Sequence, residues 1–181
     1  SNRDKLEEIF YMPTIVGGKQ GDVINLMKKT VQSRLAREAG LLMPEEWIIN
    51  LRNAVEIPED VIFPCFVKPI ESITGFKVEM RRCEDREELY KHLLWLKDRN
   101  DDRDILVQEF LDIDHEIDLS GVALDQKIII PAIIRKTQVA MYEKGVTLAG
   151  VVKPAEELGQ ELLEKIEKLM KSFHYCGMID L

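Results

Sequence analysis

The order of helix-like and strand-like stretches predicts an α+β protein built from two lobes. Apolar residues recur with helical spacing near residues 23–39, 85–99 and 154–171, whereas the stretches between them are rich in β-branched and aromatic residues. After residue 105, strand follows strand until about residue 154. Runs of strands set apart from helices are typical of an α+β fold rather than an alternating βαβ fold.

The composition disfavours several functional classes before any motif is considered. The chain has 181 residues, of which 45% are hydrophobic, so it is long enough to bury a core. Its 33 acidic residues outnumber its 25 basic residues, which disfavours a nucleic-acid partner. The longest apolar run, 128–134, contains Pro131 and is too short to cross a membrane. Three widely spaced cysteines indicate reduced thiols, and we expect a cytoplasmic protein.

Three parts are expected along the chain. These are an extension or linker over 1–20, a first lobe over 21–107 and a second lobe over 108–181. Two lobes of this size leave room for a small ligand between them.

The first lobe begins with a helix that is followed by short strands. The helix is predicted over 23–39, because apolar residues recur every four positions and Gly40 then supplies a stop signal. Strands are predicted at 47–49 and 62–69 from their β-branched and aromatic residues. A further strand is predicted at 76–81 from the alternation of apolar and charged residues.

A capping box predicts the second helix. Asp85 and Glu88 stand three residues apart before a periodic apolar stretch. In that arrangement each side chain can accept a hydrogen bond from a backbone N–H group at the helix start. The helix should run to about Arg99, and the charged residues 98–104 should form a loop.

The second lobe is predicted to be a series of antiparallel strands closed by a helix. Tight hairpins are expected at 125–126 and 144–145. A helix is predicted over 154–171, with Gly177 as its stop signal, before a last strand at 178–181. The other strands are predicted at 105–111, 116–124, 127–135, 138–143 and 146–152.

Residues 107–116 carry the most specific functional pattern. Glu109 ends an apolar strand, and Glu116 follows seven residues later. Adenine requires an acceptor for its amine and a backbone donor for N1, while a ribose requires an acceptor for its hydroxyl groups. The alternative is that the two acids are exposed residues beside an edge strand.

Two lysines fit an anionic ligand. Lys68 lies within an apolar strand directly before Pro69, where an ammonium group must either reach solvent or meet an anion. Lys28 and Lys29 lie near the start of the first predicted helix, where the alternative is a solvated charge pair. Two ammonium groups can neutralise a polyphosphate without bidentate geometry.

Together these stretches resemble the nucleotide site of the ATP-grasp family. The resemblance rests on a helix that begins with a lysine and ends at Gly40, on the Lys68–Pro69 strand, and on the hinge at 107–116. By spacing, Lys29 matches the family better than Lys28. The resemblance implies two α+β lobes with a nucleotide cleft between them. It also implies that Lys29 and Lys68 contact the phosphates.

The resemblance extends to the base, the ribose and the substrates. It implies that Glu109 accepts the adenine amine, that the backbone of Phe110 and Leu111 pairs with the ring edge, and that Glu116 holds the ribose. It also implies that Arg135 faces the phosphates or a carboxylate substrate.

Two further family features are only partly represented. Gly75 stands where the family has a glycine-rich phosphate loop, although a plain hairpin turn is an alternative. Asp180 is the candidate magnesium ligand. The Glu-x-Asn strand that follows in the family is not within this sequence, so we expect this stretch by itself to show no ligase turnover. No histidine is assigned a catalytic role.

The implied function is that of an ATP-dependent carboxylate–amine or carboxylate–ammonia ligase that forms an acyl phosphate. Within the family, the pattern is most similar to carbamoyl-phosphate-synthase-like and D-aspartate-ligase-like members. ATP and Mg²⁺ are the implied cofactors, and a small carboxylate and an amine are the implied substrates. Two alternatives stay open, a non-catalytic nucleotide-binding module and a structural interaction domain. Whether the protein forms a homo-oligomer also stays open.

Overall fold

The computed structural model divides the chain into two compact units. Unit 1 comprises Ser1–Leu26, Leu35–Leu41 and Ile113–Leu181, and unit 2 comprises Met27–Arg34 and Leu42–Asp112. The residues that the structure describes are 14–15, 28–70, 79–99, 103–124, 127–140, 146–173 and 175–180. Each unit has its own sheet and its own hydrophobic core.

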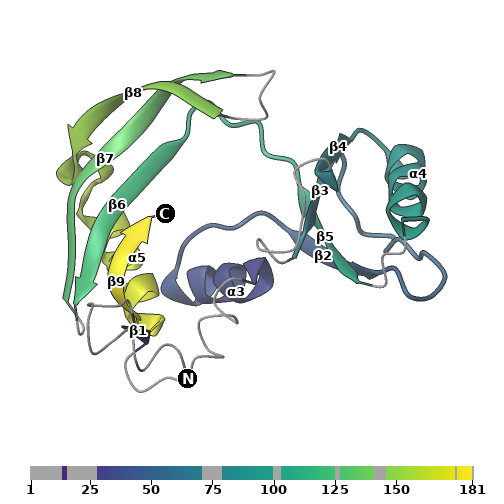
Figure 1. The fold of residues 1–181 in the computed structure, drawn as a ribbon, viewed down its shortest axis with the longest axis horizontal. Coiled ribbons are helices and arrows are strands. Elements are labelled where there is room, and N and C mark those ends of the chain that lie inside the picture. Colours follow the sequence, from purple (N-terminus) through teal and green to yellow (C-terminus); the bar gives the residue numbers. More distant parts are fainter. Residues whose placement is uncertain are drawn as a thin grey trace. The chain divides into compact units, whose positions relative to one another are not determined.

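Unit 2 is an antiparallel sheet with one helix on one face (Figure 1). The strand order is β2-β5-β3-β4. Helix α4, Arg86–Lys97, packs Leu89, Leu93 and Leu96 against the sheet. The strands are β2 Glu46–Asn50, β3 Cys65–Pro69, β4 Arg81–Cys83 and β5 Asp104–Glu109.

The predicted capping box starts α4. The side chain of Asp85 accepts a hydrogen bond of 2.9 Å from the N–H group of Glu88, and the Glu88 carboxylate accepts one of 3.0 Å from the N–H group of Glu84. The first bond satisfies a backbone donor that a helix start leaves without an intrahelical partner, whereas the second goes to the residue before the N-cap Asp85. The helix then buries Leu89 and Leu93 completely, one turn apart.

The side chains of β3 alternate between the core and the opposite face of the sheet. Cys65 and Val67 are fully buried in the core with α4, whereas Phe66 and Lys68 are partly buried. This period of two follows from strand geometry, and it places Lys68 on the face turned away from α4. Cys65 lies opposite Cys83 of β4, and both are free thiols.

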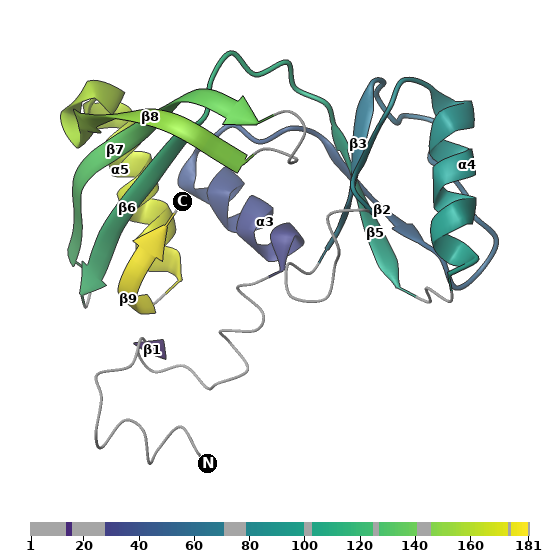
Figure 2. The ribbon, with the colours of Figure 1, turned by 45° about the horizontal axis from the view of Figure 1, so that its top comes forward.

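Unit 1 is a five-stranded antiparallel sheet in the order β1-β9-β6-β7-β8 (Figure 2). Its core joins β6, β7 and β9 to the buried side of helix α5. The strands are β1 Thr14–Ile15, β6 Ile117–Leu124, β7 Lys127–Ala140, β8 Val146–Pro154 and β9 Tyr175–Asp180. The helices are the 3₁₀ turn η3, Ala155–Leu158, and α5, Gln160–Ser172.

Helix α3, Lys29–Ala39, contributes its first residues to unit 2 and its last residues to unit 1. In unit 2, the N–H group of Lys29 donates to the carbonyl of Ile70 over 3.1 Å, which fixes the helix start to the end of β3. In unit 1, Gly40 has a φ of +92° at the helix end, as the stop signal predicts. The part of the predicted helix before Lys28 lies outside the described residues.

The structure corrects four details of the predicted elements. The strands expected at 127–135 and 138–143 are one strand, β7, with an irregular register after Lys136. The helix expected over 154–171 is two pieces, because Gly159 adopts a φ of +81° that a continuous helix cannot contain. Gly177 lies within β9 rather than at a helix end. Strand β3 begins only after Pro64, which has no N–H group to donate to a ladder.

The remaining predicted elements lie where the sequence indicates, but some fall outside the described residues. The hairpin turns at 125–126 and 144–145 belong to this undescribed part, although the strands on either side pair antiparallel. Residues 76–78 of the strand predicted at 76–81 also belong to it. The rest of that prediction is wrong, because Glu79 and Met80 are not in a strand and β4 runs from Arg81 to Cys83. In the described part of the chain, no helix has the length and apolarity needed to span a membrane.

The core of unit 2 gives a prediction for stability. Replacing the fully buried Leu93 by Ala should destabilise unit 2 by about 2–5 kcal/mol, because the mutation removes buried methyl groups and leaves a cavity. Leu94→Ala, at a neighbouring helix position that is 36% exposed, should cost much less. Both tryptophans, Trp47 and Trp95, belong to unit 2, so urea denaturation followed by tryptophan fluorescence reports on this unit. Equal losses for the two variants would contradict this core.

Candidate functional site

Unit 2 brings together the two lysines predicted to contact phosphates. Lys68 lies in the middle of β3, opposite Leu106 of β5, and Lys29 is the first residue of α3. Both side chains are partly buried. The hydrogen bond from the backbone of Lys29 to Ile70 sets the distance between the two elements.

Electrostatics disfavour the positive charge on both lysines. Burial lowers the pKa of Lys68, the positive charge of Lys29 lowers it further, and the negative charge of Glu46 opposes both effects. Burial also lowers the pKa of Lys29. Each ammonium group has lost part of its hydration, and the charge of Lys29 repels that of Lys68. An anion in contact with both ammonium groups would therefore be bound favourably.

A chain of hydrogen bonds holds the Lys68 ammonium group. Lys68 Nζ donates to Gln108 Oε1 over 2.6 Å, and Gln108 Nε2 donates to Glu46 Oε1 over 2.6 Å. The hydroxyl of Ser33 on α3 donates to the same Glu46 oxygen over 2.8 Å. Sequence reasoning missed Glu46 and Gln108. The available signal was that Gln108, like Lys68, is a polar residue that follows an apolar stretch of a strand.

The hinge begins with a strand end that is fastened to the rest of unit 2. The N–H group of Glu109 donates to the carbonyl of Glu45 over 2.9 Å, and the Glu109 carboxylate accepts from the N–H group of Glu45 over 3.3 Å. The N–H group of Phe110 donates to the carbonyl of Pro64 over 3.0 Å. The Phe110 N–H group is therefore already hydrogen-bonded within the protein. The predicted backbone contacts for a base are then the Phe110 carbonyl and the backbone of Leu111.

The ring of Phe110 is also fixed within unit 2. The guanidinium carbon of Arg82 lies 4.3 Å from the ring centroid, a distance suited to a cation–π interaction. The Phe66 ring lies 6.5 Å away in a tilted arrangement. Leu111, the next residue along the hinge, is 47% exposed.

In unit 1, Glu116 is part of a cluster of two acids and one lysine. Lys136 Nζ lies 2.9 Å from Glu116 Oε2 and 2.9 Å from Asp118 Oδ1. These two hydrogen bonds raise the pKa of Lys136. The N–H group of Lys136 also donates to the carbonyl of Glu116 over 2.9 Å. Glu116, the residue predicted to bind the ribose, is therefore held in place by Lys136.

Arg135 lies beside His115 in unit 1. Its Nη2 atom is 3.3 Å from His115 Nδ1, and the same ring nitrogen is 2.9 Å from Asp114 Oδ2. One nitrogen cannot donate to Asp114 and accept from Arg135 in the same protonation state. The shorter contact favours donation to Asp114, whose pKa the hydrogen bond from His115 lowers.

Asp180 fits the predicted magnesium site only as a single ligand. It lies in β9 opposite Ser120, whose hydroxyl donates to Asp180 Oδ1 over 3.0 Å. Carboxylate and hydroxyl oxygens are donors of the kind that Mg²⁺ prefers. Among the described residues, however, no group of three or more His, Cys, Asp and Glu side chains is placed to hold a metal ion. Gly75, the predicted loop glycine, lies outside the described residues.

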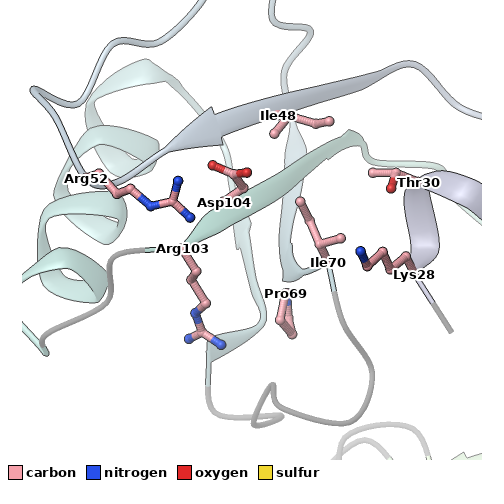
Figure 3. Close-up of a pocket in the computed structure, with 8 residues that line it drawn as sticks. All are labelled: Lys28, Thr30, Ile48, Arg52, Pro69, Ile70, Arg103 and Asp104. Atoms are coloured by element: carbon pink, nitrogen blue, oxygen red, sulfur yellow. The ribbon is translucent and has the colours of Figure 1, made fainter. Parts of the chain in front are cut away.

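A cavity of about 380 Å³ opens in unit 2 at the ends of β2 and β3 (Figure 3). Its volume is in the range of small-molecule sites. The cavity is lined by neighbours of the two site lysines rather than by those lysines themselves, and three of its side chains are cationic. Asp104, its one acid, accepts a hydrogen bond of 2.5 Å from Asn50. The lining residues are Lys28, Thr30, Ile48, Arg52, Pro69, Ile70, Arg103 and Asp104.

No protein-family model matches this chain. It is 24% identical over 172 residues to the C-terminal section of the carbamoyl phosphate synthase large chain from Aquifex aeolicus, which covers 92% of this chain and 31% of that protein. The chain spans about a third of the length of the curated relatives it matches first.

Solved structures of ligases share the fold. The D-alanine–D-alanine ligase from Bacillus anthracis complexed with ATP aligns with a TM-score of 0.56 and 16% identity, over 85% of this chain and 48% of that one. The N5-carboxyaminoimidazole synthase from Aspergillus clavatus, in complex with ADP and 5-aminoimidazole ribonucleotide, aligns with a TM-score of 0.63 and 13% identity, over 99% and 44%. The chain has the ATP-grasp fold.

The ATP-grasp resemblance and the α+β class predicted from the sequence are thus confirmed. The structure places Lys29, Lys68 and the hinge residues Glu109, Phe110 and Leu111 in unit 2. The remaining predicted site residues, Glu116, Arg135 and Asp180, lie in unit 1. The individual roles of these residues stay predictions.

The lysine pair gives a prediction about pH. Replacing Lys29 by Met should raise the pKa of Lys68, because the charge of Lys29 is one of the causes that lower it. Titration of the Lys68 ¹³Cε signal by NMR measures this change. Lys91→Met is a matched control, because Lys91 is exposed on α4 and pairs with Glu87. A Lys68 titration that does not move in Lys29→Met would show that the two ammonium groups are too far apart to interact.

Proposed function

We propose that this chain is the nucleotide-binding ATP-grasp part of an ATP-dependent ligase that joins a carboxylate to an amine or ammonia. The observation that carries the proposal is the pair of partly buried lysines at the start of α3 and in β3. Both have a lowered pKa, so their charges are costly in the absence of an anion. The relative named carbamoyl phosphate synthase and the ligases of the same fold support this reaction class.

The proposed reaction has two steps. An oxygen of the substrate carboxylate attacks the γ-phosphorus of ATP, the bond from that phosphorus to the bridging oxygen breaks, and ADP leaves. The nitrogen nucleophile then attacks the carbonyl carbon of the acyl phosphate, loses a proton and expels phosphate. The protein contributes positioning and charge neutralisation rather than covalent chemistry.

Each named residue has a role in this proposal. Lys29 and Lys68 bind the phosphates, and Arg135 stabilises charge on the phosphates or on a carboxylate substrate. Glu109 and the carbonyl of Phe110 accept the adenine amine, the N–H group of Leu111 donates to N1, and Glu116 accepts from the ribose hydroxyls. Mg²⁺, when bound, would neutralise phosphate charge, and Asp180 is the residue that we propose contributes to its binding.

A nucleotide-binding module without ligase activity is the second candidate. It is favoured by the finding that, in the described part of the chain, no three metal-binding side chains come together. Without metal-bridging carboxylates the developing phosphoryl charge lacks a major stabiliser. Phosphate release assays with ammonia and small amines test this second candidate. ATP hydrolysis that depends on an added carboxylate would exclude the second.

The lysine roles predict a specific loss of affinity. Lys68→Met and Lys29→Met should each weaken ATP by about 1.5–3 kcal/mol, because a charge-assisted hydrogen bond to phosphate is lost. Adenosine should be almost unaffected, since it carries no phosphate. Isothermal titration calorimetry with both ligands measures the difference. Lys91→Met is the control, because it makes the same substitution on α4, on the opposite face of the sheet. Equal weakening of ATP and adenosine would mean that the substitutions only disturb packing.

The hinge predicts a preference between bases. ATP should bind at least about tenfold more tightly than GTP, because guanine presents a carbonyl to the acceptors and an N–H group to the backbone donor. Glu116→Ala should weaken ATP and GTP by the same factor, since both carry the same ribose. Competition titrations with the two nucleotides decide the question. The hinge assignment fails if GTP binds as tightly as ATP, or if Glu116→Ala changes neither affinity.

A further inference from the structure

The hydrogen-bond chain from Ser33 to Lys68 has a fixed direction. Gln108 presents its Oε1 atom to the Lys68 ammonium group and its Nε2 atom to the Glu46 carboxylate, each over 2.6 Å. A flipped amide would set donor against donor at Lys68 and acceptor against acceptor at Glu46. Gln108 can therefore occupy only one orientation while both neighbours are charged. This makes the position of Lys68 Nζ depend on Glu46.

This hydrogen-bond chain also connects α3 with β3, the two elements that carry Lys29 and Lys68. Ser33 is 4% exposed and lies on α3 four residues after Lys29, so the two residues share one face of the helix. Its hydroxyl donates to Glu46 on β2, which connects through Gln108 on β5 to Lys68 on β3. All five residues belong to unit 2.

Among the described residues, the charged groups that act on Lys68 can be named. From the neighbouring elements, Glu46 of β2 supplies a negative charge, Lys29 of α3 supplies a positive charge, and Gln108 of β5 is neutral. On β3 itself, the adjacent residues are uncharged. Glu46 is thus the carboxylate that offsets the burial of Lys68 and the repulsion by Lys29.

The neutral amide between the two charges matters for a ligand. A carboxylate in direct contact with Lys68 would occupy the position that a phosphate oxygen needs. With Gln108 in between, one of the three ammonium donors is used for a hydrogen bond to a described residue, and the negative charge of Glu46 still favours the protonated form. The arrangement keeps Lys68 charged, aims it, and leaves donors for an anion.

We propose that Glu46, acting through Gln108, is a positioning residue that aims the Lys68 ammonium group at a bound polyphosphate. This inference rests on the proposed function, because it takes the phosphates of a nucleotide as the partner of Lys68. Glu46 itself contacts no phosphate. Its effect is therefore confined to ligands that carry phosphates and depends on the charge state of Lys68.

The test uses Glu46→Gln, which keeps the shape of the side chain and removes its charge. Lys68 should titrate at lower pH than in the unsubstituted protein, because the charge of Glu46 raises its pKa. ATP affinity should fall about tenfold and should decline at a lower pH than before, since binding requires protonated Lys68. Adenosine affinity should not change. Lys68 ¹³Cε titration by NMR and calorimetry with ATP and adenosine across pH 7–10 measure these effects.

Two further variants complete the experiment. Gln108→Leu removes the amide that links Lys68 to Glu46 without changing the number of charges. This variant should also bind ATP more weakly, while its affinity for adenosine should not change. Glu56→Gln removes one negative charge from an exposed position of unit 2 and should change neither the titration nor the affinities. Tryptophan fluorescence confirms that unit 2 is folded in each variant.

The outcomes separate this inference from the proposed function. An unchanged Lys68 titration in Glu46→Gln, or equal weakening of ATP and adenosine, overturns the positioning role. If the unsubstituted protein does not bind ATP, the proposed function fails, and the positioning of Lys68 for a polyphosphate fails with it. In that case the NMR titration still shows whether Glu46 sets the charge state of Lys68.

Discussion

The burial of the Lys68 ammonium group is the constraint on which the other features of unit 2 depend. An ammonium group that leaves water loses hydration, and the nearby charge of Lys29 adds to that cost. The hydrogen bond to Gln108 and the charge of Glu46 offset part of it. What remains is a position that an anion would stabilise, which is the physical basis for assigning phosphate binding here.

The scaffold of unit 2 makes this arrangement possible by separating two faces of one sheet. Helix α4 packs Leu89 and Leu93 against Cys65 and Val67 of β3 in the hydrophobic core on one face of the sheet. The period of two then directs Lys68 to the other face. Fixing the start of α3 to Ile70 places Lys29 on the same unit. The hydrophobic core thus lies on one face of the sheet and the proposed phosphate-binding residue Lys68 on the other.

Local signals predicted the elements well, whereas contacts between distant residues could not be predicted. The Asp85–Glu88 capping box and the alternation around Lys68 depend on neighbours in sequence, and the structure bears both out. The link from Glu46 to Gln108 joins strands 62 positions apart, so only the sheet register shows it. The break at Gly159 depends on a backbone angle that helical periodicity does not encode. In the same way, the use of the Phe110 N–H group by Pro64 required the fold.

The titration of Lys68 tests most directly whether its ammonium group binds a phosphate. Lys68 ¹³Cε should be titrated by NMR in the unsubstituted protein, alone and with saturating ATP or adenosine. ATP should raise the lowered pKa of Lys68, because phosphate charge favours the protonated form, while adenosine should leave it unchanged. Binding of ATP without any change in the Lys68 titration would contradict phosphate binding by Lys68.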